Sequence, residues 1–218
     1  MIEVLLVDDH EVVRIGMRHV LNDARGIHVR HECKSGEQAM VYLRAHHVDV
    51  VLMDLSMPGQ GGMETIRRLL RLKPDQRIVV VSAMTSDVMP ARILEMGVMG
   101  YLSKGAPAEE LIESVRSAHD GQRYLGTDVA QRLAVGLLPG GSATSLDILS
   151  QREMQVMMMV AEGQGLHQIA ESLCVSPKTV GTYRYRLYEK LNITNDVELT
   201  HVAIEHGLAG PGRTSPSE

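Results

Sequence analysis

The first part of the chain alternates between short apolar runs and amphipathic stretches. Short apolar runs rich in Val and Ile are typical of buried strands when helical patterns separate them. Strands are predicted at 3–7, 27–32, 48–53, 78–82 and 100–103. Helices are predicted at 11–23, 36–46, 62–73, 86–97 and 107–120. The alternation predicts an α/β domain with a doubly wound, five-stranded parallel sheet.

The second part of the chain lacks strand signals. From Leu149 onward, helical patterns remain at 151–162, 167–173, 177–191 and 196–206. Helix-start signals precede three of them, namely Ser150 with Glu153, Ser176 before Pro177, and Asn195 with Glu198. We therefore expect an all-α second domain of four helices.

Gly, Pro and Ser are concentrated between the two parts, over residues 136–145, which predicts a linker. A weaker helical pattern at 128–135 precedes it. We expect a first domain at 1–122, a linker with a short helix at 123–147, a helical domain at 148–208 and a disordered tail at 209–218.

Composition excludes several classes of protein. No apolar stretch approaches the roughly 18 residues of a membrane span, and the first residues do not form a secretory signal, so we expect a cytoplasmic protein. The chain has 14 Met but no Phe or Trp, so methionines are expected to fill core gaps. The net charge of −5 argues against indiscriminate coating of nucleic acid but allows a local basic surface.

Polar residues follow four of the apolar runs: Asp8 and Asp9, Asp54, Ser82 and Lys104. Parallel strands of such a sheet end at one edge, where ligands bind, so these side chains should meet. Clustered carboxylates need a compensating cation, and hard oxygen ligands suit Mg²⁺. The pattern predicts a site for a cation and a phosphoryl group. Taken singly, each residue could equally be a loop or capping residue.

The motifs at these positions resemble the receiver domain of bacterial two-component response regulators, over residues 1 to about 120. They are Val7-Asp8-Asp9-His10, Met53 to Pro58, Ser82-Ala83, and Tyr101 to Lys104. The resemblance implies a flavodoxin-like fold. Many receivers have proline after the lysine, whereas Gly105 stands there in this chain.

The resemblance also implies roles for individual residues. Asp54 would accept a phosphoryl group from the phosphohistidine of a sensor kinase or phosphotransfer domain. Asp8, Asp9, Asp54 and the backbone carbonyl of Ser56 would hold Mg²⁺. Lys104 would contact the phosphoryl group, and Ser82 and Tyr101 would form a switch pair.

The predicted helix at 177–191 is basic within an acidic domain. Between 178 and 190 the balance is +3, whereas 145–209 has five basic and eight acidic residues. A short helix and turn precede it, which is the helix-turn-helix pattern of DNA-binding proteins. A solvated amphipathic helix would show the same charges.

This second part resembles the LuxR-type DNA-binding domain, over about 148–208. The motifs are Leu149 to Glu153, Gln168 to Ala170, Val175 to Val180, and Lys190-Leu191. Together the two domains resemble the NarL/FixJ family, and most of all its GacA/UvrY group. By position, Gly181, Thr182 and Tyr185 would face base edges, whereas Lys178, Thr179, Tyr183, Arg186 and Lys190 would contact phosphates.

In this family the helix expected at 196–206 commonly forms a dimer contact. Val197, Val202 and Ala203 could supply an apolar face for it, or could be core residues. The resemblance therefore implies a homodimer on activation.

The sequence predicts a phosphorylation-activated, DNA-binding transcriptional response regulator. It would be no enzyme toward other substrates, because the receiver would catalyse only its own phosphoryl transfer and dephosphorylation. One alternative is an Asp-nucleophile phosphatase, but such enzymes usually carry a second Asp where this chain has Ser56. Another is a phospho-regulated protein- or RNA-binding module.

Overall fold

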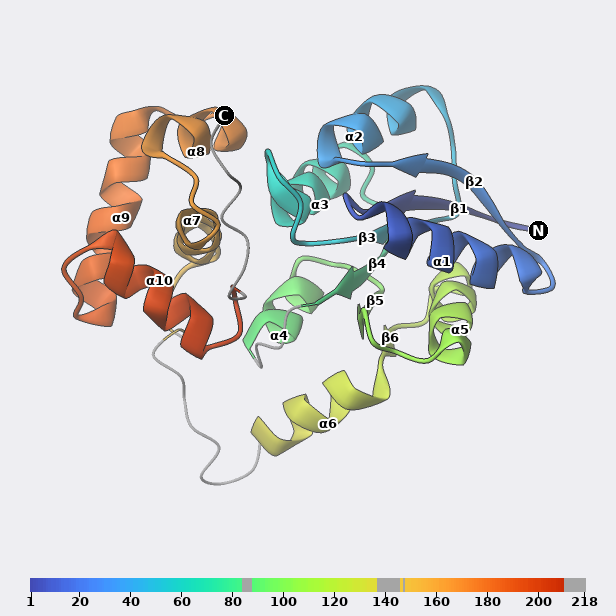
Figure 1. Ribbon diagram of the computed structural model, residues 1–218. Helices are drawn as coiled ribbons and strands as arrows, with labels where there is room; N and C mark the ends of the chain where they lie inside the picture. The colour runs from blue at the N-terminus through green and yellow to red at the C-terminus, as the bar shows by residue number, and fades with distance from the viewer. Residues whose placement is uncertain (84–87, 137–145, 147, 210–218) are drawn as a thin grey trace. The chain divides into compact units, whose positions relative to one another are not determined.

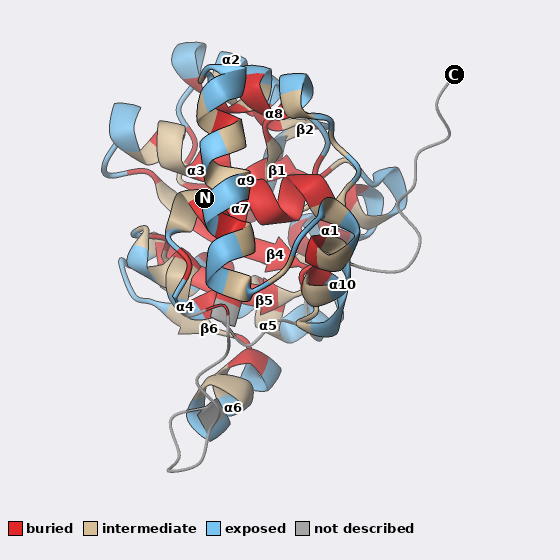
Figure 2. Cartoon of the chain, turned by 90° about the vertical axis from the view of Figure 1, so that its left-hand side faces the viewer, coloured by how far each residue is buried: buried red, intermediate tan, exposed pale blue. Residues whose placement is uncertain are grey.

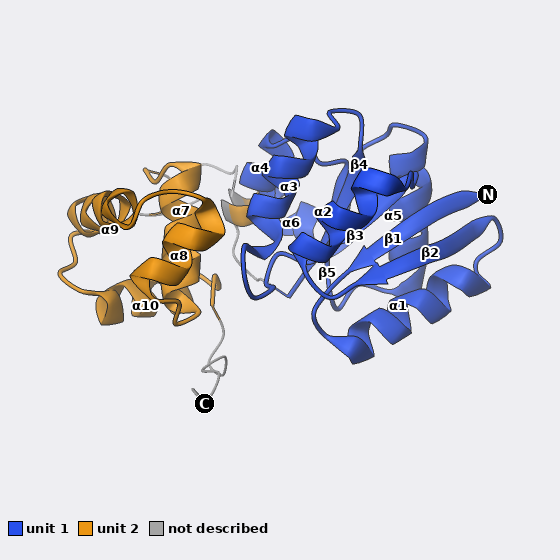
Figure 3. Cartoon of the chain, turned by 90° about the horizontal axis from the view of Figure 1, so that it is seen from above, with its two compact units in different colours: residues 1–83, 90–134 blue, residues 84–89, 135–218 orange. Residues whose placement is uncertain are grey.

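The computed structural model describes residues 1–83, 88–136, 146 and 148–209, and it contains two compact units (Figure 3). The first unit comprises residues 1–83 and 90–134, and the second is built from the C-terminal helices. Residues 137–145 and 147 of the predicted linker, and residues 210–218 of the predicted tail, lie outside the described residues.

The first unit contains one parallel sheet in the order β2-β1-β3-β4-β5-β6 (Figure 1). Its strands are β1 (Ile2–Val7), β2 (Ile27–Cys33), β3 (Val50–Met53), β4 (Arg77–Ser82), β5 (Gly100–Ser103) and β6 (Tyr124–Leu125). The order of the first five is that of flavodoxin-like folds, with the switch point between β1 and β3. The predicted doubly wound parallel sheet is confirmed.

Helices cover both faces of this sheet, as Figure 1 shows. These helices are α1 (Glu11–Asp23), α2 (Gly36–Ala45), α3 (Gly61–Leu72), α4 (Val88–Glu95) and α5 (Ala108–His119), and α6 (Thr127–Gly136) follows β6. Alternate strand residues such as Leu6, Leu52 and Leu102 pack with α1 and α5. The intervening residues point to the opposite face because side chains alternate along a strand. In Figure 2 the strands β4 and β5 of this sheet are coloured red, as buried.

A sixth strand makes the sheet one strand wider than the sequence predicts. The backbone N–H of Tyr124 donates to Met99 (2.9 Å), and that of Gly126 donates to Tyr101 (3.0 Å). Gly100 permits this approach, since a Cβ there would lie 2.9 Å from the carbonyl oxygen of Tyr124. Residues predicted to start the linker are thus part of the first unit.

The second unit contains α7 (Gln151–Ala161), α8 (Leu166–Leu173), α9 (Pro177–Leu191) and α10 (Asp196–Glu205). Helix α7 packs against the other three. Its buried side chains include four methionines, Met154, Met157, Met158 and Met159. The absence of Phe and Trp is therefore met partly by Met, as the composition indicates.

The predicted helix starts of this unit are present. Ser150 and Glu153 form a capping box, and the Ser176 side chain accepts from the N–H of Thr179. Between α8 and α9 the chain turns through Cys174, which has a left-handed φ of 53°. Helices α8 and α9 form the predicted helix-turn-helix.

Candidate functional site

The predicted strand-end side chains meet at the carboxyl edge of the sheet. Lys104 Nζ lies 2.8 Å from Asp54 Oδ2 and 2.6 Å from Asp8 Oδ2. Hydrogen bonds between strand ends fix these positions, because Asp54 N donates to Val7 (2.8 Å) and Lys104 N donates to Ser82 (2.9 Å). One ammonium thus bridges two carboxylates from neighbouring strands.

Asp54 and Asp8 are both buried. Burial raises the pKa of Asp54, the Lys104 ammonium opposes this effect, and the Asp8 carboxylate adds to it. The N–H of Ser56 donates to Asp54 Oδ1 at 3.2 Å. The backbone packs closely here, since a Cβ at Gly62, near the start of α3, would lie 1.9 Å from the carbonyl oxygen of Asp54.

Asp9 and His10 complete an acidic cluster. One ligand atom from each of Asp8, Asp9, His10 and Asp54 lies within 4.8 Å of the others. The His10 Nδ1 is 2.8 Å from Asp9 Oδ1 and 3.3 Å from Asp8 Oδ1. Such a group of oxygen donors can hold a divalent cation.

Arg14 is a site residue that the sequence analysis missed. Its guanidinium is buried and donates to the carbonyl oxygen of Asp8 at 2.7 Å, and it also pairs with Glu32. Arg14 shares the buried face of α1 with Met17 and Leu21. The sequence carried one signal for this residue, an arginine at a position where the helical spacing predicts an apolar side chain.

Ser82 and Tyr101 lie on adjacent strands and both are fully buried. Burial raises the pKa of Tyr101 to about 12, while the nearby Ser82 hydroxyl and Arg132 lower it. The Tyr101 hydroxyl has no hydrogen-bond partner among the described residues. The Lys104–Gly105 peptide bond is trans.

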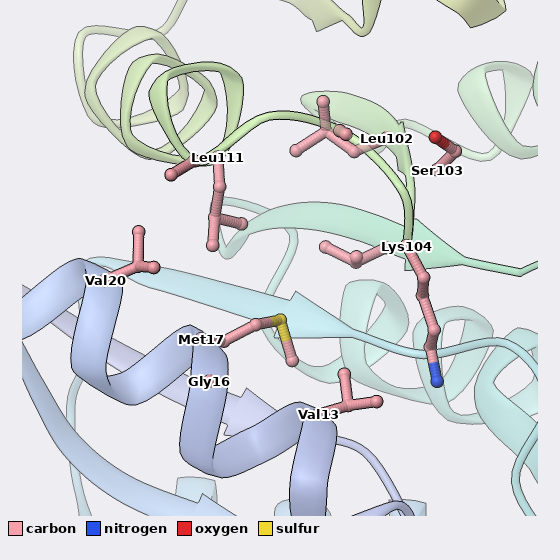
Figure 4. A pocket seen from close by; sticks show the side chains of 11 residues that line it. Val13, Gly16, Met17, Val20, Leu102, Ser103, Lys104 and Leu111 are labelled. Atoms are coloured by element: carbon pink, nitrogen blue, oxygen red, sulfur yellow. The ribbon is translucent and has the colours of Figure 1, made fainter.

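A pocket of about 350 Å³ lies between α1 and β5–α5, beside this site (Figure 4). Val13, Met17, Leu102 and Leu111 point into it, and the aliphatic part of Lys104 lies along it. The lysine stem is therefore in apolar surroundings, whereas its ammonium reaches the carboxylates.

Helix α9 has the two faces that the sequence predicts. Val180 and Leu187 are buried against the unit, and Tyr185 is 62% exposed. The other predicted DNA-contact residues are exposed (Lys178, Thr182, Arg186, Lys190) or half-buried (Thr179, Gly181, Tyr183). The exposed face can lie against a nucleic-acid groove.

Two basic residues of α9 have partners within the unit. Lys190 Nζ lies 2.7 Å from Glu153 Oε2 and donates to the carbonyl oxygen of Ile148 at 3.0 Å. Arg184 pairs with Asp196 of α10. These two cations therefore stabilise the packing of helices within the unit. A count of charges along the sequence does not reveal this role.

The predicted apolar residues of α10 divide between the two interpretations, core packing and an apolar face available for a dimer contact. Ala203 is buried and belongs to the core, Val202 is half-buried, and Val197 is 65% exposed.

In the part of the chain that the structure describes, no helix is long and apolar enough to cross a membrane.

Two family models match the chain. The response regulator receiver domain matches residues 4–116, and the bacterial regulatory proteins of the luxR family match residues 147–203. An acidic strand-end site followed by a helix-turn-helix unit defines a transcription factor of the response-regulator class. The chain belongs to the response regulators with a LuxR-type domain, which regulate transcription through phosphorylation-dependent DNA binding.

Its relatives agree with this class. Response regulator UvrY of Escherichia coli is 49% identical over 209 residues, which cover 95% of this chain and 96% of that protein. Response regulator GacA of Pseudomonas aeruginosa is 44% identical over 209 residues, or 95% of this chain and 98% of that protein. The RcsB response regulator of Salmonella typhimurium shares the fold, with a TM-score of 0.79 at 24% identity over 94% of this chain and 98% of RcsB.

Proposed function

We propose that Asp54 accepts a phosphoryl group from the phosphohistidine of a sensor kinase or phosphotransfer domain. The observation that supports this proposal is the buried Asp54–Lys104–Asp8 arrangement at the strand ends. An Asp54 oxygen forms a bond to phosphorus while the bond between phosphorus and the donor imidazole nitrogen breaks. Lys104 then offsets the added negative charge.

The donor set fits a hard divalent cation. Asp8 Oδ2 and Asp9 Oδ1 are buried carboxylate oxygens that contact the Lys104 ammonium (2.6 Å) and the His10 ring (2.8 Å), respectively. We assign Mg²⁺ to Asp8, Asp9, Asp54 and the backbone carbonyl of Ser56. When bound, the ion supplies positive charge for the phosphoryl oxygens.

Ser82 and Tyr101 are proposed to report the phosphorylated state. Phosphorylation adds roughly −1.5 to −2 charges and three acceptor oxygens. Ser82 can donate to one of these oxygens. Tyr101 already lies buried in this structure, so the role assigned to phosphorylation is to hold it there.

The exposed face of α9 is proposed to enter the major groove of duplex DNA. Gly181, Thr182 and Tyr185 would face base edges. The phosphates would be contacted by Lys178, Thr179, Tyr183 and Arg186. Lys190 is not included, because its ammonium pairs with Glu153. Side chains that read bases strongly are few, so specificity would come from DNA shape and from two half-sites.

Activation is proposed to act through a homodimer. Exposed Val197 on α10 offers an apolar contact, and two linked half-site contacts raise effective concentration. The proposed parts are a receiver domain at 1–122, a linker segment at 123–147 whose β6 and α6 pack as part of the first unit, and a DNA-binding domain at 148–208. Because its target is DNA, we place the protein in the cytoplasm.

The phosphoacceptor is tested by labelling with radioactive acetyl phosphate in the presence of Mg²⁺. The wild type should take up one label per chain, and Asp54→Asn should take up none. Asp23→Asn, an exposed acid on α1, is the matched control. Undiminished label in Asp54→Asn would refute the assignment, and many turnovers per chain would favour a phosphatase.

A further inference from the structure

Arg14 is a charged residue at an apolar position of α1. It lies three residues before Met17 and seven before Leu21, and all three side chains are buried on the same helix. An apolar side chain would pack there at least as well, because burying a charge costs desolvation free energy even when the charge is paired. The packing of α1 therefore does not explain why this side chain is a guanidinium.

The guanidinium of Arg14 joins two neighbouring parts of the sheet. Its Nη1 donates to the backbone carbonyl oxygen of Asp8, directly after β1, at 2.7 Å. Its Nε lies 3.4 Å from Oε2 of Glu32, which belongs to β2. Because the guanidinium is planar and its donors have fixed directions, the pairing with Glu32 orients the donor that reaches Asp8.

The carbonyl group that Arg14 binds belongs to the peptide unit between Asp8 and Asp9. This unit is planar, so a bond that fixes its oxygen also restricts the Cα atoms of both residues. The N–H of Asp8 donates to Cys33 at 3.1 Å, and Asp8 Oδ1 accepts from the N–H of His10 at 2.8 Å. The Arg14 bond adds a hold on the peptide unit that carries both carboxylates.

We propose that Arg14 is a positioning residue of the metal and phosphoryl site, and that it acts by orienting the Asp8–Asp9 peptide unit. The proposal rests on the metal ligands assigned above to these two residues. With the peptide unit fixed, a divalent ion does not have to order the two carboxylates when it binds, which favours binding. Arg14 acts through the backbone and is not itself a ligand.

Charge alone predicts the opposite effect of removing Arg14. A buried guanidinium near the acidic cluster repels a divalent cation, so its removal would strengthen Mg²⁺ binding if only charge mattered. Loss of positioning would instead weaken Mg²⁺ binding. A role limited to the stability of the fold would leave the Mg²⁺ affinity of the folded protein unchanged. The sign of the change in affinity therefore separates the three roles.

The test measures Mg²⁺ binding to the full chain by calorimetry, without a phosphoryl donor. Arg14→Met removes the guanidinium and keeps an unbranched apolar stem. We expect it to lose about tenfold in Mg²⁺ affinity, as is typical when a residue that orients a metal ligand is removed. Arg14→Lys keeps the charge but not the planar fork, and it should lose less. Arg18→Met is the matched control, since Arg18 pairs with the same Glu32 from an exposed position, and it should lose none.

The backbone amide resonance of Asp9 gives a second measurement, on the protein without Mg²⁺. This N–H belongs to the peptide unit whose oxygen accepts from Arg14. Its ¹⁵N chemical shift should therefore change in Arg14→Met and stay close to the wild-type value in Arg18→Met. An unchanged Asp9 resonance in Arg14→Met would overturn the proposal.

A Mg²⁺ affinity in Arg14→Met that equals or exceeds that of the wild type would also overturn it. If Arg14→Met does not fold, Arg14→Lys takes its place, and wild-type affinity there would have the same meaning. The metal site itself is checked with Asp9→Asn. Wild-type Mg²⁺ affinity in that variant would refute the site assignment, whereas a loss in Asp9→Asn without a loss in Arg14→Met would refute only the role of Arg14.

Discussion

Asp54 faces a second buried carboxylate, Asp8, across a single ammonium. Two carboxylates in one buried site repel each other, so the arrangement depends on accurate placement of Lys104. The chain places it by backbone bonds between strand ends and by the apolar pocket around the lysine stem. At this scale, the phosphoryl transfer proposed for Asp54 depends on how closely the backbone packs around it.

Gly62 tests this close packing. Gly62→Ala would place a Cβ 1.9 Å from the Asp54 carbonyl oxygen, so α3 or the loop must shift. We expect a loss of about 3 kcal/mol in the free energy of unfolding. Gly16→Ala is the control, because no atom lies within 4 Å of its added Cβ, and a mid-helix alanine should stabilise by about 0.5–1 kcal/mol. Urea unfolding measures both, and equal stability of the two variants would contradict the prediction.

Lys190 gives a prediction that depends on pH. Burial raises the pKa of Glu153, but hydrogen bonds from Lys190 and Ser150 outweigh this effect, and the pKa lies below its ordinary 4.5. Because folding lowers the pKa of this carboxyl, its ionised form stabilises the fold at pH values above the ordinary carboxyl pKa. This stabilisation is lost as the pH falls through the lowered pKa of the folded state. Lys190→Met should therefore cost about 2 kcal/mol at pH 7 and less near pH 3. Thermal unfolding at both pH values checks this, and a cost independent of pH would exclude the ion pair as its cause.

The sequence predicted part of this site and missed part of it. Asp8, Asp54 and Lys104 were predicted to meet because the ends of parallel strands share one edge. The ring direction of His10 and the burial of Arg14 were not predicted, because they depend on how α1 packs. The Lys190–Glu153 pair joins residues 37 apart, which no local pattern can indicate.

At the scale of elements, boundaries were predictable where capping chemistry is strong. Helix α9 spans 177–191 as predicted, since Ser176 caps its start and Asn192 ends it in a left-handed conformation. Four of the five longer strands, β1, β3, β4 and β5, were found from their apolar runs. Strand β6 has two residues, too few for any periodicity, and so only the structure reveals it.

Helix α9 carries the prediction for DNA binding. Lys178 is exposed at its N-terminal end, and each phosphate contact contributes about 0.9 to the slope of log affinity against log salt. Lys178→Ala should lower that slope by about this amount for specific and random duplexes alike. Lys34→Ala, an exposed lysine of the first unit, removes the same charge as a control. Fluorescence anisotropy at several salt concentrations measures the slopes, and equal slopes would remove Lys178 from the interface.

At the scale of the whole molecule, the first unit extends beyond the predicted receiver boundary. Thr127 of α6 donates to Glu110 of α5, and Val129 is fully buried. Arg132 of the same helix is close enough to Tyr101 to affect its pKa. The proposed switch residue is therefore adjacent to the segment that leads to the second unit.

Two fragments test where the receiver ends. A fragment of residues 1–136 keeps β6 and α6, whereas 1–122 loses the ladder bonds of β6 and the burial of Val129. The longer fragment should be more stable by about 2 kcal/mol, the value of one buried Val side chain. Chemical denaturation of both gives the difference. Identical midpoints would show that β6 and α6 add nothing to the receiver.

Oxidation of the methionines of α7 can report whether the second unit has unfolded. Met154, Met157, Met158 and Met159 are at most 6% exposed in the folded unit. Peroxide converts an accessible methionine to a polar sulfoxide, which a packed core does not accommodate. Oxidation should therefore follow unfolding and then prevent refolding. The sulfoxide content of these four residues would therefore measure the fraction of molecules in which the DNA-binding unit has opened.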